Sequence, residues 1–198
     1  SNRGSQLFYL VLGGVIFIIF GKALEIDINN IQPLQIITYI FTILYVSVLM
    51  IIAGIDQKLL KMEKSVITAG IILSILYMIY MFVIETISLN TSIIYLGIYI
   101  ILIAIDTFII KRYAKNSYST GILMLFNIML IFTGIEVFTY TIILTALEIL
   151  VSLIISKIKQ KKNGNKKIRL SNVPVGYFLC VSNLLAIVAI SVMIAYIR

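Results

Sequence analysis

Long apolar runs alternate with short polar segments along the whole chain. Most of these runs are about 18–22 residues long, which is enough for an α-helix to cross the hydrocarbon core of a bilayer. We therefore predict an all-α, polytopic membrane bundle of about six to seven transmembrane helices. The expected spans are Gln6–Phe20, Leu34–Gly54, Ser65–Ile84, Thr91–Ile110, Thr120–Thr133, Glu136–Ser156 and Val175–Ile197. The fifth span is short, so we expect it to be tilted, partly re-entrant, or joined to the sixth by a bend at Gly134.

The basic residues gather in three of the polar segments, which are 55–64, 111–119 and 157–173. Counting the spans places all three segments on one side of the membrane, and an excess of Lys and Arg marks the cytoplasmic side. The most basic stretch, Lys157–Arg169, is expected to form a solvated loop against anionic lipid headgroups. The abundance of Ile, Lys and Asn is typical of an AT-rich bacterial genome. We therefore expect an integral protein of a bacterial cytoplasmic membrane.

Composition narrows the chemistry that the chain can perform. The net charge is +8, but it lies in loops between apolar runs, so we expect a role in topology and no nucleic-acid partner. The chain has no His and one Cys, which excludes His-based catalysis, Cys-His pairs, His-rich metal sites and internal disulfides. Cys180 lies in an apolar run and is interpreted as a packing residue. We treat residues 1–5 as a cloning remnant and 6–198 as a single membrane domain.

Two of the three aspartates occupy the same setting at the end of an apolar run. Asp56 and Asp106 each follow an Ile, and each is followed within a few residues by a Lys. An ionised carboxyl near the membrane is unfavourable unless it is hydrated, paired or functional. Two carboxyls brought together would share a proton, so that one activates water while the other polarises a peptide carbonyl. This is the chemistry of an aspartic peptidase.

A structural role is the alternative for both aspartates. Asp56 would then end its helix and pair with Lys58 or Lys61 in the headgroup region. Asp106 would pair with a polar side chain of a neighbouring helix, or extend toward Lys111.

Two glutamates also fall within the predicted spans. Glu136 is expected near the outer surface. Glu148 lies in the middle of its span, so it must face the bundle interior or water. Glu148 and Asp106 therefore keep an ion- or proton-linked transporter as a further alternative.

Three segments of the chain follow one another in an order that is known from a peptidase family. They are the apolar run that ends at Asp56, the stretch Asn116–Gly134 after the second basic segment, and the stretch Asn172–Ile190 after the third. From about Leu34 to the C terminus, this arrangement resembles the type IV prepilin peptidases and their archaeal preflagellin relatives. In that family the last segment has an Ile-Pro-Phe-Gly-Pro-Phe-Leu-like pattern, of which this chain retains Pro174, Gly176, Phe178 and Leu179.

The resemblance implies a membrane aspartic endopeptidase that cuts the basic leader from prepilin-like transmembrane substrates at the cytoplasmic face, as in type IV pilus assembly and protein secretion. Asp56 takes the place of the first catalytic Asp. Met62-Glu63 stands where the family usually has an Ile-Pro pair. The chain lacks the paired Cys-x-x-Cys motifs of the bifunctional members, so no zinc, no other cofactor and no methyltransferase activity are expected.

The segment of the second catalytic Asp departs from the family pattern. Where the family has Gly-x-Gly-Asp, Ser117 and Ser119 take the glycine positions and Thr120 takes the Asp position. Thr120 cannot ionise, so the usual pair of acids is broken in this alignment. Asp106 is our candidate replacement for the missing acid. The alternative is a non-catalytic homologue that binds prepilin-like helices or supports their assembly.

Overall fold

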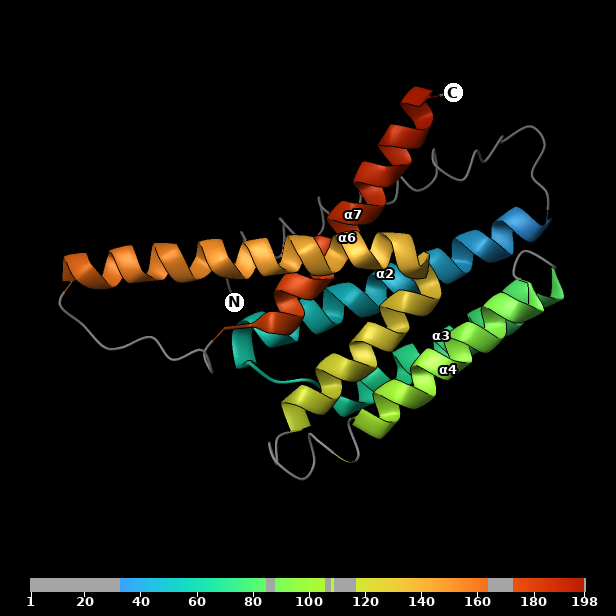
Figure 1. Cartoon of the computed structure of the whole chain (residues 1–198), viewed down its shortest axis with the longest axis horizontal. Helices are drawn as coiled ribbons and strands as arrows, with labels where there is room; N and C mark the ends of the chain where they lie inside the picture. Colours follow the sequence, from blue (N-terminus) through green and yellow to red (C-terminus); the bar gives the residue numbers. More distant parts are fainter. Residues whose placement is uncertain (1–32, 85–87, 106–107, 109–116, 164–172, 198) are drawn as a thin grey trace.

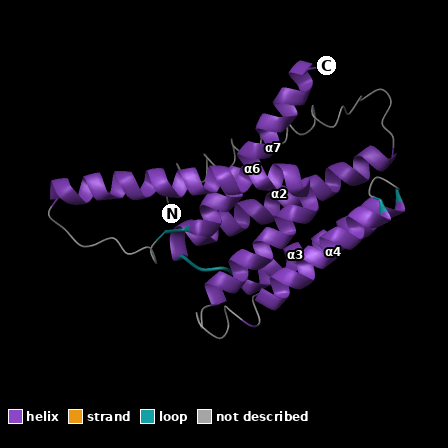
Figure 2. Cartoon of the chain, viewed as in Figure 1, coloured by secondary structure: helices purple, strands orange, loops and turns teal. Residues whose placement is uncertain are grey.

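The computed structural model describes residues 33–84, 88–105, 108, 117–163 and 173–197. These residues form helices and loops and contain no strand, which confirms the all-α class (Figure 2). The helices are α2 (Pro33–Leu59), α3 (Lys64–Val83), α4 (Leu89–Ile105), α6 (Ser117–Asn163) and α7 (Val175–Ile197). Long apolar stretches free of interior proline favour helices, because a helix satisfies its own backbone groups where water is absent.

Three helical stretches are long and apolar enough to cross a membrane: Pro33–Leu59, Lys64–Val83 and Tyr118–Ile158. Their outward faces are as apolar as their core, with exposed side chains such as Ile72, Ile79 and Leu147. A helix that is hydrophobic all round is typical of a membrane span. Length and composition therefore point to a membrane protein.

Several predicted features lie outside the described residues. They are residues 1–5, the span Gln6–Phe20, Asp106, residues 111–116 of the second basic segment and residues 164–172 of the third.

The described helices pack around α2 and α6, each of which contacts both α3 and α7 (Figure 1). Helix α7 lies against α6 and α2, α3 lies against the same two helices, and α4 packs on α3 and α6. The side chains at the centre of this packing are fully buried, among them Leu49 of α2, Leu125 and Met129 of α6, and Leu179 of α7. This arrangement brings the end of α2 close to the beginnings of α6 and α7.

Helix α6 contains a sharp bend at Gly134, where φ is 73° and ψ is 172°. This combination of angles is accessible almost only to glycine, because a Cβ atom would collide with the backbone. Beyond the bend the helix turns back and its second half crosses α7 (Figure 1). Of the three geometries expected for the short fifth span, the bend at Gly134 is the one that the structure shows.

A neutral polar centre lies between α2, the second half of α6, and α7. The Tyr45 hydroxyl donates to Asn183 Oδ1, and Asn183 Nδ2 donates to Thr141 Oγ1 at 2.9 Å. Thr141 Oγ1 in turn donates to the Val137 carbonyl at 2.8 Å. All three side chains are buried. We call Tyr45, Thr141 and Asn183 the Asn183 centre.

Candidate functional site

Asp56 lies in the last turn of α2 and is fully buried. The helix continues to Leu59, past the predicted end of the span, so Asp56 has a helical backbone. It lies on the face of α2 that also buries Ile52 and Ala53. This face packs against other helices, so the carboxyl is enclosed by protein.

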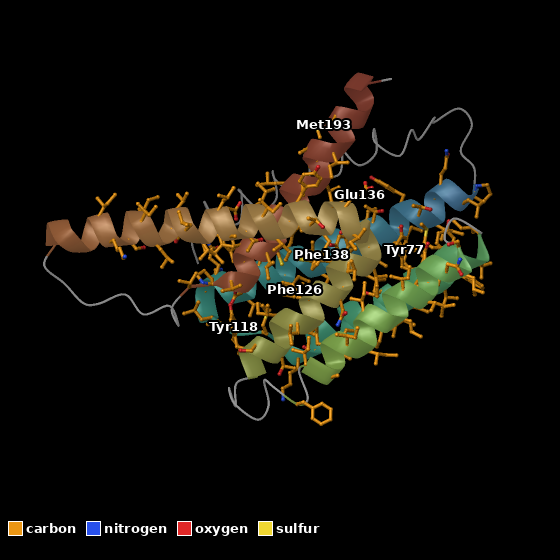
Figure 3. All side chains as sticks on the ribbon, in the orientation of Figure 1. Tyr77, Tyr118, Phe126, Glu136, Phe138 and Met193 are labelled. Carbon is orange, nitrogen blue, oxygen red and sulfur yellow. The ribbon has the colours of Figure 1, made fainter. Side chains whose placement is uncertain are left out.

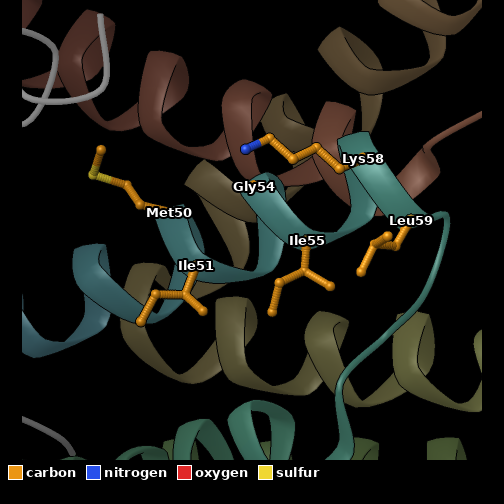
Figure 4. Close-up of a pocket in the computed structure, with 6 residues that line it drawn as sticks. All are labelled: Met50, Ile51, Gly54, Ile55, Lys58 and Leu59. Atoms are coloured by element: carbon orange, nitrogen blue, oxygen red, sulfur yellow. The ribbon is translucent and has the colours of Figure 1, made fainter. Parts of the chain in front are cut away.

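The opposite face of α2 carries a shallow outer groove, which Lys58 lines together with Ile51, Gly54 and Ile55 (Figure 4). Lys61 pairs with Glu63, at 2.9 Å between Nζ and Oε2. The alternative in which Asp56 pairs with Lys58 or Lys61 in the headgroup region is therefore wrong. Residues two positions apart on a helix point in nearly opposite directions, which separates Asp56 from Lys58.

The Asp56 carboxyl is bound from two other helices. Its Oδ2 accepts a hydrogen bond from the Tyr118 hydroxyl at 3.0 Å and another from the Tyr177 backbone N–H at 2.9 Å. Tyr118 lies at the start of α6, beside the beginning of α7 (Figure 3). Its hydroxyl also accepts from the backbone N–H of Val175 at 3.0 Å, and the N–H of Gly176 lies 3.4 Å away. We call Asp56, Tyr118 and the first turn of α7 the Asp56 centre.

This arrangement caps α7. The first N–H groups of a helix have no partner within the helix, and they favour a negative charge nearby. Here Asp56 of α2 and Tyr118 of α6 supply the missing acceptors. The same contacts thus hold the ends of three helices together.

The second oxygen of the carboxyl, Oδ1, is buried and has no hydrogen-bond partner. A buried acceptor without a partner is unfavourable by about 1–3 kcal/mol, more if it is charged, and needs an explanation. Oδ1 is therefore the carboxyl oxygen that keeps an unused hydrogen-bond acceptor, and protein atoms cover it in this structure.

Glycines bring Met62 close to the carboxyl. A Cβ on Gly176 would overlap Met62 Cε and lie 3.0 Å from Asp56 Oδ2, and one on Gly121 would lie 2.5 Å from Met62 Cβ. Met62 is itself buried, at 6% exposure. Met62, one of the two residues that we expected in the place of an Ile-Pro pair, therefore fills the space beside Asp56.

The structure brings together the three segments that carry the resemblance. Asp56, the start of α6 and the first turn of α7, which includes Gly176, meet in the Asp56 centre. Tyr118, whose hydroxyl bonds to Asp56, was not among the predicted site residues. Its position between Ser117 and Ser119, in the stretch compared above with Gly-x-Gly-Asp, marks the segment but not the contact with Asp56.

Tyr118 does not restore the chemistry of two acids. A phenol is a far weaker acid than a carboxyl, so it can orient Asp56 but cannot share a proton as a second carboxyl does. Among the described residues, no carboxyl other than Asp56 bonds within this centre. Thr120 lies in the first turn of α6, and Asp106 falls outside the described residues.

The remaining candidate residues lie elsewhere. Cys180 is a free, fully buried thiol in the core, in agreement with its predicted packing role. Glu136 is exposed just after the bend in α6 (Figure 3), and Glu148 lies in the second half of α6, partly buried against α7. In the described part of the chain, no cluster of His, Cys, Asp and Glu could hold a metal ion.

Comparison of the chain with protein-family models, with curated proteins and with solved structures finds no match. We therefore infer function from the three sequence segments and from the geometry in which they meet.

Proposed function

We propose that this chain is a prepilin-peptidase-like membrane protein with six to seven transmembrane helices, which binds prepilin-like substrates at the cytoplasmic face. The supporting observation is the convergence at the Asp56 centre. Tyr118 and Tyr177 lie 62 and 121 residues beyond Asp56 in the sequence, yet both bond to its carboxyl. These contacts join the same three segments that carry the family resemblance.

In the catalytic form of this proposal, the protein is an aspartic endopeptidase that removes the basic leader of its substrate. Asp56 activates water through its unpartnered Oδ1. The second acid, which protonates or polarises the scissile carbonyl, is Asp106. Both residues follow an apolar run on the side of the membrane that carries the basic segments.

The second candidate is a non-catalytic homologue that binds prepilin-like helices or supports their assembly. Two observations favour it. Asp56 Oδ2 is occupied in capping α7, and a phenol rather than a carboxyl bonds to it. Thr120 at the family's second acid position cannot ionise.

A cleavage assay separates the two forms. The full chain in liposomes is incubated with a synthetic prepilin-like peptide, beside the variants Asp56→Asn, Asp106→Asn and Thr120→Asp. Cleavage that is lost in both Asn variants supports the catalytic form. Binding without cleavage by the intact chain, with cleavage gained in Thr120→Asp, supports the non-catalytic form. A chain that neither binds nor cuts the peptide in any variant contradicts the proposal. Glu136→Gln is the matched control, because Glu136 is exposed and remote from the Asp56 centre.

A further inference from the structure

A polar stripe runs along the second half of α6, beside α7. Its members are spaced by three or four residues, which places them on one face of the helix. They are Thr141, Thr145, Glu148, Ser152 and Ser156. The last three line a groove with a cavity volume of about 570 Å³, whose other α6 residues are apolar. The stripe therefore gives an apolar helix one polar edge.

The stripe changes character at Glu148. The hydroxyls of Thr141 and Thr145 donate to backbone carbonyls one turn back, at 2.8 and 2.7 Å. The Glu148 carboxyl has Ser182 of α7, a fully buried residue, as its polar neighbour. Glu148 Oε2 and Ser182 Oγ are both buried, and neither completes a hydrogen bond. At this point an acid and a hydroxyl from two helices therefore retain capacity for one more proton.

The described residues place no cation against the Glu148 carboxyl. Helix α4 contains no charged residue. Lys64, the one cation of α3, is the first residue of that helix, which packs on the first half of α6. On α6 itself the nearest cation is Lys157, which lies about 13.5 Å further along the axis. The other titratable side chains that the structure describes on α3 and α7 are Tyr77, Tyr80, Tyr177 and Cys180.

We propose that Glu148 and Ser182 form a proton-binding site, in which Glu148 is protonated at neutral pH and its O–H donates to Ser182 Oγ. Ser182 can also donate to an ionised carboxylate, but the negative charge then stays in an apolar span without a counter-ion. Protonation satisfies both oxygens and leaves no charge. This site does not depend on the activity of the Asp56 centre.

The groove connects the site to the basic end of α6. Ser152 and Ser156 follow Glu148 at intervals of four residues, and Ser156 directly precedes Lys157. The distance from Glu148 to Ser156 is about 12 Å along the helix axis. Both hydroxyls can hold water along this path, because a serine side chain donates and accepts hydrogen bonds. The bound proton therefore exchanges with water at the basic end.

Infrared spectroscopy of the full chain in lipid nanodiscs tests the protonation directly. A protonated carboxyl has a carbonyl stretching band that a carboxylate lacks, and an ordinary Glu is ionised at pH 7. We expect Glu148→Gln to remove such a band from the spectrum at pH 7. Glu136→Gln, the same change on an exposed part of α6, is expected to leave it. A spectrum that Glu148→Gln does not change would overturn the proposal, as would loss of the band when Na⁺ replaces choline at constant pH.

Ser182→Ala tests the partner of the acid. Loss of the hydrogen bond should shift the Glu148 band to higher frequency. Ser74→Ala is the matched control, because Ser74 is also buried but donates to the Gly70 carbonyl within α3. A band that keeps its frequency in Ser182→Ala would contradict the pairing.

Deuterium exchange of the same band tests the access path. Ser152→Phe narrows the groove and is expected to slow exchange about tenfold, which corresponds to about 1.4 kcal/mol in the barrier. Leu150→Phe should exchange at the rate of the intact chain, since Leu150 is exposed on the same helix but does not line the groove. Equal rates in the two variants would contradict access through the groove. Each measurement is read without peptide cleavage, so failure of the proposed function leaves its outcome unchanged.

Discussion

The Asp56 centre and the Asn183 centre join the same three helices but differ in chemistry. The Asn183 centre is neutral, and its bonds run from Tyr45 through Asn183 and Thr141 to a backbone carbonyl. Each of its polar side-chain atoms has a partner. The Asp56 centre contains an acid, and one oxygen of that acid has no partner.

This difference separates a structural role from a candidate functional one. A neutral network in which every polar atom is bonded fixes the position of one helix against the next. It has no free acceptor for another molecule. An acid with an open acceptor is less favourable to bury and retains the capacity to bind or to accept a proton. The following variants test this distinction, from the largest expected effect on stability to the smallest.

The largest effect is expected from Asn183→Ala. It removes two interhelical hydrogen bonds and leaves the buried Tyr45 hydroxyl without its acceptor, so the free energy of unfolding should fall by about 3 kcal/mol. Unfolding of the full chain in mixed detergent and SDS measures this. Asn127→Ala is the matched control, because Asn127 is also buried but its Nδ2 has no partner. Equal losses in the two variants would contradict the closed network.

Gly176→Ala tests the packing of the Asp56 centre. Because the new Cβ overlaps Met62 and approaches Asp56 Oδ2, we expect a loss of about 2 kcal/mol from overpacking. Gly54→Ala is the control, since its Cβ would meet nothing within 4 Å. That control should be neutral or slightly stabilising, because Ala is a better helix former than Gly. A neutral Gly176→Ala would show that Met62 does not fill the space beside Asp56.

The two tyrosines allow a direct comparison of the centres. Tyr118→Phe removes the hydroxyl that donates to Asp56 and that accepts from the Val175 N–H in the first turn of α7. Tyr45→Phe removes only a donor to Asn183. We expect losses of about 1.5 and about 0.7 kcal/mol, measured by the same unfolding assay. The reverse order would mean that Tyr118 does not cap α7.

A similarly small effect on stability is expected from Asp56→Asn. The amide keeps an oxygen that can accept from Tyr177, and the variant loses only the charge near the start of α7, which is about 0.3–1 kcal/mol. In the catalytic form of the proposed function, the same change abolishes peptide cleavage. A loss of stability above about 2 kcal/mol would assign Asp56 mainly to structure.

The lengths of the apolar runs predicted two of the helices, and the isolated acid at their edge predicted one residue of the candidate site. The spans at Leu34–Gly54 and Ser65–Ile84 correspond to α2 and α3, and a bend at Gly134 was among the expected geometries. The extent of α2 was not predicted, because apolarity ends at Gly54 while the backbone stays helical to Leu59. Helix α6 likewise extends past its predicted span, to Asn163, so residues 157–163 of the predicted basic loop are helical.

Tyr118 shows why part of the site could not be predicted. It is one of 12 tyrosines, and its partner lies 62 residues away in the sequence. The local sequence pattern cannot predict that the two side chains are in contact, because their distance in space depends on how α2, α6 and α7 pack. Asp56 was recognisable because an isolated acid in an apolar run is costly wherever the run lies.

The capping of α7 has a consequence for the order in which the protein is made. Tyr177 follows Asp56 by 121 residues, so at about 5–20 residues per second the ribosome needs roughly 6–24 seconds to supply it. During that interval α2 carries a carboxyl whose partner in α7 does not yet exist. We expect nascent chains that stop before α7 to remain incompletely assembled at this end of α2, where a membrane protease or chaperone can distinguish them from finished molecules.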